Sequence, residues 1–312
     1  MINKNSRIYV AGHTGLVGSA IIRKLKLNGY KKIITAKRKA LDLTDQKKTF
    51  NFLKKKKPDF IFICAAKVGG ILANNTYRGQ FIFENLQIQN NLIHGAYKNK
   101  IKRLIFLGSS CVYPRMCKQP IKENFLLNAS LEKTNEPYAI AKIAGIKLCE
   151  NYNYQYGTSY LCLMPTNTYG PNDNFDLKTS HFIPALIRKV HEIKNKKSRN
   201  LKIWGDGSAK REVIYVDDLA DACIFFMKKK IKHSLINIGT GKDFFIDVYA
   251  KKILKILNVN AKIVYDKKKP NGTPKKLLDI SLAAKYGWKS KISLETGIKL
   301  SYKAYLKSSV SG

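Results

Sequence analysis

The sequence predicts an α/β fold, in which a Rossmann-type, doubly wound parallel sheet is joined to a smaller C-terminal α/β lobe. Short, almost entirely apolar segments alternate with helical segments through the first two thirds of the chain. Such segments are typical of strands that are buried on both faces of a parallel sheet. A glycine-rich turn follows the first apolar segment, and a Tyr-x-x-x-Lys pair follows the fourth. Both features suit a dinucleotide-binding fold.

The predicted elements follow one another in a regular order. We expect strands at residues 7–12, 32–36, 58–64, 102–108 and 159–164, and helices at residues 44–57, 75–98, 138–156 and 180–195, besides the helix that opens after the glycine-rich turn. Residues 213–219 indicate a strand that leads into a capped helix and returns to the sheet. We therefore assign residues 1–170, with 213–238 returning, to the dinucleotide-binding domain. Residues 171–212 and 239–312 are expected to form the substrate lobe.

The composition argues against several classes of protein. With 312 residues, of which 45% are hydrophobic, the chain can bury a full core. The N-terminus lacks the apolar stretch of a signal peptide, and no run approaches the ~18 apolar residues that a membrane helix needs. The six cysteines show no metal-type spacing. We expect a cytoplasmic protein with reduced thiols, no bound metal and no membrane contact.

The net charge of +37, from 58 Lys+Arg against 21 Asp+Glu, is the most unusual bulk property. Such an excess can indicate nucleic-acid binding. The lysines are, however, spread along the whole chain, and Lys, Asn and Ile are all abundant, as an AT-rich coding sequence would produce. We therefore favour a compositional bias without a specific nucleic-acid partner. A positive field would still attract an anionic nucleotide.

The glycine-rich turn is the predicted cofactor site. Gly12, Gly15 and Gly18 lie between the first strand and the first helix, where glycines allow a tight turn and a close approach of the backbone to a pyrophosphate. The helix N-terminus adds amide donors and a partial positive charge. The other residues of this turn that we expect to contact the cofactor are His13, Thr14, Leu16 and Val17.

The end of the second strand indicates which nucleotide binds. An acidic residue there would bind the ribose hydroxyls of NAD, but this chain has Lys37, Arg38 and Lys39. Because an arginine suits a 2′-phosphate, we favour NADP and assign Arg38 to that phosphate. Asp42, slightly further on, either contacts the adenine or caps the following helix.

Tyr138 and Lys142 are the predicted centre of proton transfer. Residues four apart share one face of a helix, so the Lys142 ammonium can lie near the Tyr138 phenol. A free tyrosine has a pKa near ~10, and a nearby cation is expected to lower the pKa of Tyr138 towards neutrality. Ser109 and Ser110 end the fourth strand, where alternation directs only one of the two hydroxyls into the site.

Several longer blocks identify a family. Together with the glycine pattern, the strand-end serine and the Tyr-x-x-x-Lys pair, they resemble the extended short-chain dehydrogenase/reductase superfamily and, within it, the GDP-L-fucose synthase family. The matching blocks are residues 65–71, 73–76, 107–114, 134–150, 164–171, 180–186 and 272–279. They are distributed over essentially the full length of the chain.

The resemblance implies NADPH as cofactor, a GDP-4-keto-6-deoxy-D-mannose substrate and a homodimer. It implies two epimerisations, at C3 and C5, and one reduction, at C4, to give GDP-L-fucose. The hydrogens beside the C4 ketone are acidic, and Cys111 and His181 are the implied base and acid that invert these centres. Tyr138 is implied to protonate the C4 oxygen, with Ser109 as a second donor and Lys142 on the nicotinamide ribose.

The same resemblance implies the remaining binding residues. For the cofactor they are Leu107, Gly108, Ser109, Ser110, Lys142, Pro165, Thr166, Asn167, Thr168 and His181, and for the substrate Lys189, Trp204, Arg211 and Asp279. Two positions depart from the family pattern, since Thr14 and Lys189 stand where arginine is common. Without the resemblance, Trp204 would be a core aromatic, Lys189 and Arg211 surface charges, and Asp279 a helix cap.

Two alternatives remain open at this stage. A reductase or 4-epimerase that acts on another nucleotide sugar would share the serine, tyrosine and lysine but would not need Cys111. A protein of a different class, an inactive fold that binds RNA or has a regulatory role, is suggested only by the net charge.

Overall fold

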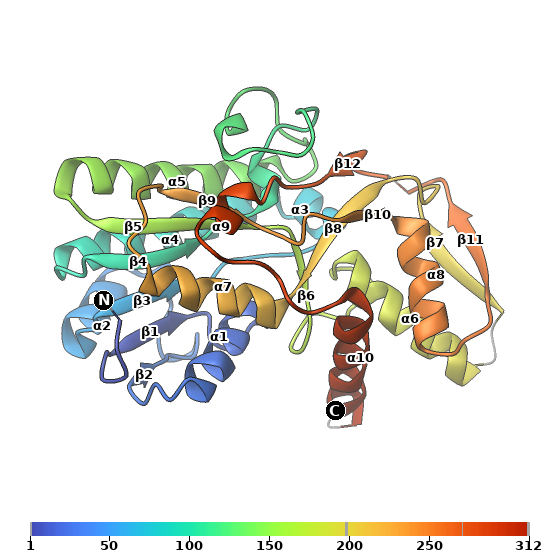
Figure 1. Ribbon diagram of the computed structural model, residues 1–312, viewed down its shortest axis with the longest axis horizontal. Coiled ribbons are helices and arrows are strands. Elements are labelled where there is room, and N and C mark those ends of the chain that lie inside the picture. Colours follow the sequence, from blue (N-terminus) through green and yellow to red (C-terminus); the bar gives the residue numbers. More distant parts are fainter. Residues whose placement is uncertain (1, 197–198, 270, 311–312) are drawn as a thin grey trace.

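The computed structural model describes residues 2–196, 199–269 and 271–310. Its main sheet has six parallel strands in the order β2-β1-β3-β4-β5-β9 (Figure 1). The strands are β1 (Ile8–Ala11), β2 (Ile33–Ile34), β3 (Phe60–Ile63), β4 (Arg103–Leu107), β5 (Ser159–Pro165) and β9 (Leu235–Ile238). The chain leaves β1 towards β2 and then crosses to β3 on the other side. The Rossmann-type fold is therefore confirmed, with a switch point beside β1 where dinucleotides bind in such sheets.

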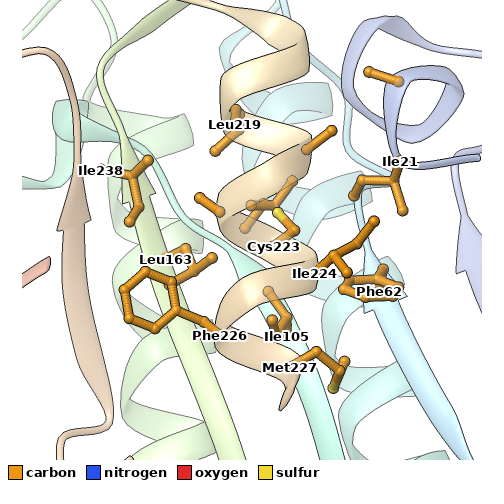
Figure 2. Close-up of a cluster of buried hydrophobic side chains, with 14 of the residues drawn as sticks. Ile21, Phe62, Ile105, Leu163, Leu219, Cys223, Ile224, Phe226, Met227 and Ile238 are labelled. Carbon is orange, nitrogen blue, oxygen red and sulfur yellow. The ribbon is translucent and has the colours of Figure 1, made fainter. Parts of the chain in front are cut away.

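Helices cover both faces of this sheet. Alternate residues of each strand point to opposite faces, and the core is accordingly split into two clusters. On one face, Val10, Phe62 and Ile105 pack with α1 (Leu16–Leu27) and α7 (Val216–Lys228). Figure 2 shows α7 on this face, with Leu219, Cys223, Ile224, Phe226 and Met227 near the strand residues Phe62, Ile105, Leu163 and Ile238.

The opposite face carries α2 (Gln46–Lys56), α4 (Arg78–Lys98) and α5 (Glu136–Tyr156). Local sequence explains the ends of these helices. Asp45 caps α2, since its side chain accepts a hydrogen bond from Lys48 N at 2.9 Å. Pro137 stands in the first turn of α5, and Gly157 ends that helix in the left-handed conformation.

The helix expected at residues 75–98 is divided in two. A short α3 (Ile71–Thr76) precedes α4, and Tyr77 between them has non-helical angles of φ −105° and ψ 41°. The polar and apolar pattern continues across this break and gave no sign of it. The consequence is that a short separate helix, α3, lies between the loop after β3 and the long helix α4.

A second group of elements lies beside the main sheet and is reached through β6 (Asn167–Tyr169), directly after β5 (Figure 1). In it β8 (Lys210–Tyr215) pairs with β6, β10 (Asp243–Phe245) and β12 (Lys275–Lys276), and β7 (Asn200–Trp204) pairs with β11 (Lys262–Asp266). A third apolar cluster joins α6 (Phe182–Lys196), α8 (Ile246–Ile256) and α10 (Leu294–Val310) to these strands. The short helices η1 (Ser110–Val112), η2 (Glu123–Phe125) and α9 (Ser281–Lys285) complete the described elements.

The strand leading into a helix that was expected at residues 213–219 is confirmed as the end of β8 and the start of α7. It does not pair with the main sheet, because β6, β10 and β12 take up its neighbouring positions. The chain returns to the main sheet only with α7 and β9. The limits of the two domains stay a prediction.

None of the helices in the described part of the chain is long and apolar enough to cross a membrane. The six cysteines are free thiols, and three of them, Cys149, Cys162 and Cys223, are buried. Among residues 2–196, 199–269 and 271–310, no group of His, Cys, Asp or Glu has a metal-binding arrangement.

Candidate active site

The glycine-rich turn brings the N-terminus of α1 close to the end of β1. Gly12 has φ +80°, and a Cβ on it would lie 2.6 Å from Ala65 N, in the loop after β3. A Cβ on Gly18 would collide with the carbonyl oxygen of Gly12. Gly15, at the N-cap, leaves the first amides of α1 directed at the switch point. The turn is therefore shaped for an anionic group that approaches the backbone closely.

Arg38 follows β2, which runs parallel to β1, so it lies at the same edge of the sheet as the glycine-rich turn. Its guanidinium is 3.5 Å from Glu84 of α4, and its side chain is 77% exposed. Lys67 contacts the same carboxylate at 2.6 Å. An exposed ion pair of this kind contributes little to stability, and Glu84 keeps Lys67 as a partner when Arg38 leaves. Arg38 can therefore bind another anion with little loss of folding free energy.

Ser109 lies between β4 and η1, and it meets Tyr138 and Lys142, which both belong to α5. The Ser109 hydroxyl accepts a hydrogen bond from Cys111 N at 3.2 Å and also hydrogen-bonds the Tyr138 phenol. Lys142 Nζ donates to the carbonyl oxygen of Leu107 at 2.8 Å and lies 5.7 Å from the Tyr138 ring centroid. The adjacent Ser110 is buried, whereas Ser109 is half-buried, so Ser109 is the hydroxyl that faces the site.

The pKa shifts at this triad differ from the expectation. Burial, followed by the nearby Cys111, raises the pKa of Tyr138, and these effects outweigh the hydrogen bond to Ser109, which lowers it. Burial lowers the pKa of Lys142 to about 8. The lowered tyrosine pKa predicted from the four-residue spacing is thus wrong, because the phenol is removed from water together with the lysine. A phenol of raised pKa stays protonated at neutral pH and is a proton donor.

Cys111 lies on η1, two residues after Ser109, and faces the second sheet. Lys276 Nζ of β12 donates a hydrogen bond to Cys111 Sγ at 3.7 Å. His181 is exposed to solvent, although many protein atoms lie around its ring. The resulting loss of hydration, followed by the charge of Lys276, lowers the pKa of His181. One ammonium therefore acts on both the thiol and the imidazole.

The loop after β3 supports the backbone that carries His181. Gly70 N donates to the carbonyl oxygen of Thr179 at 2.8 Å. A Cβ on Gly70 would lie 2.6 Å from the carbonyl oxygen of Ser180. His181 then opens α6, and its carbonyl oxygen accepts from Ala185 N at 3.1 Å. The glycine thus lets two loops from different parts of the chain touch directly before the imidazole.

The segment at residues 165–168 continues from β5 and is fixed to β8. The hydroxyl of Thr166 and the side-chain amide of Asn167 each donate to the backbone carbonyl oxygen of Glu212 at 3.0 Å. Thr168 Oγ1 donates to the carbonyl oxygen of Thr166 at 3.1 Å. These bonds hold the segment at the junction of the two sheets.

The four predicted substrate residues are spread over the second group of elements. Arg211 donates to the carbonyl oxygens of Thr273 and Asn271, the latter at 3.1 Å, and its charge interacts with Cys111. Lys189 donates to the carbonyl oxygen of Lys202 at 2.8 Å and lines a cavity of about 290 Å³ between α6 and β7.

Trp204 ends β7, with Lys269 Nζ 5.5 Å from its ring centroid. Asp279 accepts a hydrogen bond from Ser281 N at 2.9 Å, at the start of α9, although the N-cap position itself is Ile280. Of these four residues, Arg211 is the one whose described interactions include Cys111, beside the triad of Ser109, Tyr138 and Lys142.

Sequence reasoning missed two residues of this region, Lys276 and Glu212. Glu212 is fully buried, and its carboxylate accepts hydrogen bonds from Thr240 N at 2.6 Å, Gly241 N at 2.7 Å and Leu278 N at 2.9 Å. It ties the loop between β9 and β10 to the segment that follows β12. Lys276 could not be singled out because lysines are abundant everywhere in this chain. Glu212 could have been noticed more easily, because it is an acidic residue next to Arg211 in a strand.

Comparison with known proteins assigns the chain to a family. Residues 8–239 match the NAD dependent epimerase/dehydratase family. GDP-L-fucose synthase 1 of Arabidopsis thaliana is 49% identical over 307 residues, covering 98% of this chain and 95% of that protein. The GDP-L-fucose synthase of Escherichia coli (strain K12) is 46% identical over 312 residues, covering 96% of this chain and 97% of that protein.

Among solved structures, a GDP-6-OMe-4-keto-L-xylo-heptose reductase from C. jejuni is similar, with a TM-score of 0.91 at 36% identity, covering 98% of this chain and 99% of that one. These similarities extend over nearly the whole length of each protein. They agree with the parallel sheet, the glycine-rich turn and the serine, tyrosine and lysine described above. This chain belongs to the NAD dependent epimerase/dehydratase family.

Proposed function

We propose that this protein converts GDP-4-keto-6-deoxy-D-mannose to GDP-L-fucose, by NADPH-dependent epimerisation at C3 and C5 and reduction at C4. The observation that carries the proposal is the position of the Cys111 thiol. It accepts a hydrogen bond from the Lys276 ammonium, and it lies two positions along the chain from Ser109, which belongs to the proposed reductive triad. A simple ketone reductase has no use for such a thiol. The identities of 49% and 46% to GDP-L-fucose synthases support the same reaction.

The cofactor is NADP(H), which supplies a hydride when bound. The turn from Gly12 to Gly18 suits its pyrophosphate, because these two glycines let the turn pack tightly on backbone and leave the N-terminus of α1 beside the end of β1. Arg38 suits its 2′-phosphate, since the exposed contact with Glu84 is readily exchanged. Lys142, held by the carbonyl of Leu107, is the cation for the nicotinamide ribose.

Epimerisation is the task of Cys111 and His181. The thiolate removes the hydrogen beside the C4 ketone, and the electron pair moves onto the ketone oxygen as an enolate. The protonated imidazole of His181 then returns a proton to the opposite face of the same carbon. An imidazolium of lowered pKa is a stronger acid than a free one, which favours this delivery.

Reduction at C4 needs a proton for the oxygen that becomes a hydroxyl. Tyr138 is its donor, because burial keeps the phenol protonated. Ser109 contacts the phenol and provides a second donor to the same oxygen. Lys142, nearly completely buried between Phe106 and Tyr138, adds a positive charge in a region of low dielectric, where charges interact strongly.

The GDP moiety is assigned to the second group of elements. Arg211 has no carboxylate partner within ion-pairing distance in the described part of the chain, so its charge is available to a diphosphate. Lys189, Trp204 and Asp279 complete the assignment that the family resemblance implies. The segment 165–168 and His181 face the nicotinamide end of the cofactor in this arrangement.

The protein is proposed to be a cytoplasmic homodimer. The helices α4 and α5 pack together on one face of the sheet, and they carry exposed apolar side chains, Phe83 at 60% and Ile140 at 41%. A second copy of the chain would bury such side chains. Sedimentation of the wild type and of Phe83→Glu tests this, since the variant should shift towards the monomer.

The proposed reaction is tested with purified protein, NADPH and GDP-4-keto-6-deoxy-D-mannose. We expect loss of NADPH absorbance and a product with the L-galacto configuration of fucose. The similarity to a heptose reductase favours one alternative, reduction of another nucleotide sugar without epimerisation. A 6-deoxyhexose product with unchanged C3 and C5 would support that alternative. Salt-dependent binding of nucleic acid without any turnover would contradict both.

A further inference from the structure

We propose that Lys276 is a positioning residue for epimerisation, whose ammonium hydrogen-bonds the sulfur of Cys111 and stabilises negative charge on this sulfur, which accepts the proton. This inference rests on the function proposed above. Lys276 Nζ donates a hydrogen bond to Cys111 Sγ at 3.7 Å, across 165 residues of sequence. A cation beside a thiolate stabilises it, and the thiolate, rather than the thiol, is the competent base.

The sheet register places a second cation beside Lys276. β12 runs parallel to β8, and Lys276 stands opposite Arg211. Like charges on paired strands normally repel each other. Within residues 2–196, 199–269 and 271–310, no carboxylate forms an ion pair with either of them. Arg211 interacts with Glu132 only at longer range than an ion pair. The two adjacent cations can therefore act on an anion in front of them, and Cys111 is the group that Lys276 contacts.

The other groups that face Cys111 do not replace Lys276. Arg211 adds positive charge, but its guanidinium donates to the backbone carbonyls of Lys210, Asn271 and Thr273. Tyr138 is neutral, because burial raises its pKa. Desolvation and the charge of Lys276 lower the pKa of His181, which makes its imidazolium a stronger acid and not a donor to the sulfur. The hydrogen bond to the sulfur therefore comes from Lys276.

The proton transfer balances as follows. A C–H bond beside the ketone breaks, an S–H bond forms on Cys111, and the electron pair passes to the enolate oxygen. An N–H bond of protonated His181 then breaks, and a C–H bond forms on the opposite face of that carbon. Exchange with water restores the thiolate and the imidazolium. Lys276 takes no part in the transfer itself and donates a hydrogen bond to the sulfur.

The neighbouring Lys275 is a matched control. Successive residues of a strand point to opposite sides, and Lys275 Nζ lies 3.7 Å from Asp243 instead. Lys275→Met therefore removes the same charge from the same strand without touching the thiol. Lys276→Arg keeps the charge at the original position.

The first test measures the thiolate directly and does not depend on catalysis. Cys111 in the full chain is alkylated with iodoacetamide at neutral pH, and its peptide is followed by mass spectrometry. We expect Lys276→Met to slow alkylation of Cys111 at least about fivefold, and Lys276→Arg and Lys275→Met to stay within about twofold of the wild type. An unchanged rate in Lys276→Met overturns the inference. Should Lys276→Met not fold, Lys276→Gln takes its place.

The second test measures uptake of solvent deuterium at C3 and C5 of the substrate. Lys276→Met should lower the kcat for exchange about tenfold or more with a smaller change in KM. A raised KM with unchanged kcat would instead assign Lys276 to substrate binding and overturn the inference. If the wild type itself shows no exchange, the proposed epimerisation fails, whereas the alkylation comparison still decides whether Lys276 supports the thiolate.

Discussion

At the scale of single residues, Tyr138 separates the two halves of the reaction. In the proposed reaction its phenol donates the proton that completes reduction, whereas proton exchange beside the ketone uses Cys111 and His181. Tyr138→Phe should therefore lower the rate of NADPH oxidation by about 10²–10⁴ and leave deuterium exchange at C3 and C5 within a few-fold of the wild type. The matched control is Tyr154→Phe, on the same helix and 94% exposed, which should change neither rate. Loss of exchange in Tyr138→Phe would contradict this division of roles.

Asp173 is a residue whose ionisation destabilises the fold. Its Oδ2 is buried without a hydrogen-bond partner, and burial raises the pKa of Asp173 to about 7. Since an unfolded aspartate has a pKa near ~3.9, the unfolded chain loses this proton first, and the contribution of Asp173 to stability falls as pH rises from about 4 to about 7. Asp173→Asn should raise the free energy of unfolding by about 1–3 kcal/mol at pH 8 and by much less at pH 4.

Thermal or urea unfolding at the two pH values checks this prediction. The wild type at pH 4 is the internal reference, because the carboxyl group is then protonated in the folded chain and still about half protonated in the unfolded chain. Equal stabilisation at both pH values would show that the effect of Asp173→Asn does not come from ionisation.

The sequence predicted the parts of the site whose residues lie near one another in the chain. The turn from Gly12 to Gly18, and the pair Tyr138 and Lys142, follow from local spacing. Lys276 could not be predicted, because its contact with Cys111 spans 165 residues. The pKa of Tyr138 was predicted with the wrong sign, since spacing shows the neighbouring cation but not the burial that outweighs it.

At the scale of elements, the junction between the loop after β3 and the start of α6 sets the position of His181. Gly70→Ala places a Cβ 2.6 Å from the carbonyl oxygen of Ser180, so one of the two loops must move. We expect the rate of C3 and C5 exchange to fall about tenfold or more, with a smaller effect on NADPH affinity. The control is Gly79→Ala in α4, where an added Cβ meets no atom within 4 Å. Normal exchange in Gly70→Ala would show that this junction does not position the imidazole.

Strand pairing explains where element prediction failed. Five of the six main-sheet strands are apolar over most of their length and were recognised by that property, whereas β9 was not predicted. β8 was recognised as a strand near residues 213–215, but its partners β6, β10 and β12 come from distant parts of the chain. A short pattern contains no information about such partners. The break at Tyr77 was missed because helix propensity and apolar spacing continue through it.

At the scale of the whole molecule, the cofactor should stabilise the fold, because the turn, α5 and the segment 165–168 all contribute to its site. A ligand present at 100 times its Kd stabilises a protein by about 2.7 kcal/mol. Wild-type protein should show this shift with NADPH at lower concentrations than with NADH. In Arg38→Ala the advantage of NADPH should shrink by about 1–2 kcal/mol, while the response to NADH should not change.

Thermal shift titrations with the two nucleotides measure this difference on one protein sample. The response to NADH is the control for misfolding, since it does not depend on the 2′-phosphate. If Arg38→Ala retains the full preference for NADPH, the 2′-phosphate is bound by other cations of the segment, such as Lys37 or Lys39.

The most direct test of the central claim is the position of solvent deuterium in the product. Wild-type protein, NADPH and GDP-4-keto-6-deoxy-D-mannose are incubated in D₂O, and the sugar is analysed by NMR. Our account predicts deuterium at both C3 and C5 in the wild-type product, and none at either carbon in the trace product of Cys111→Ser. A reduced sugar from the wild type that keeps its original hydrogens at both carbons would contradict it.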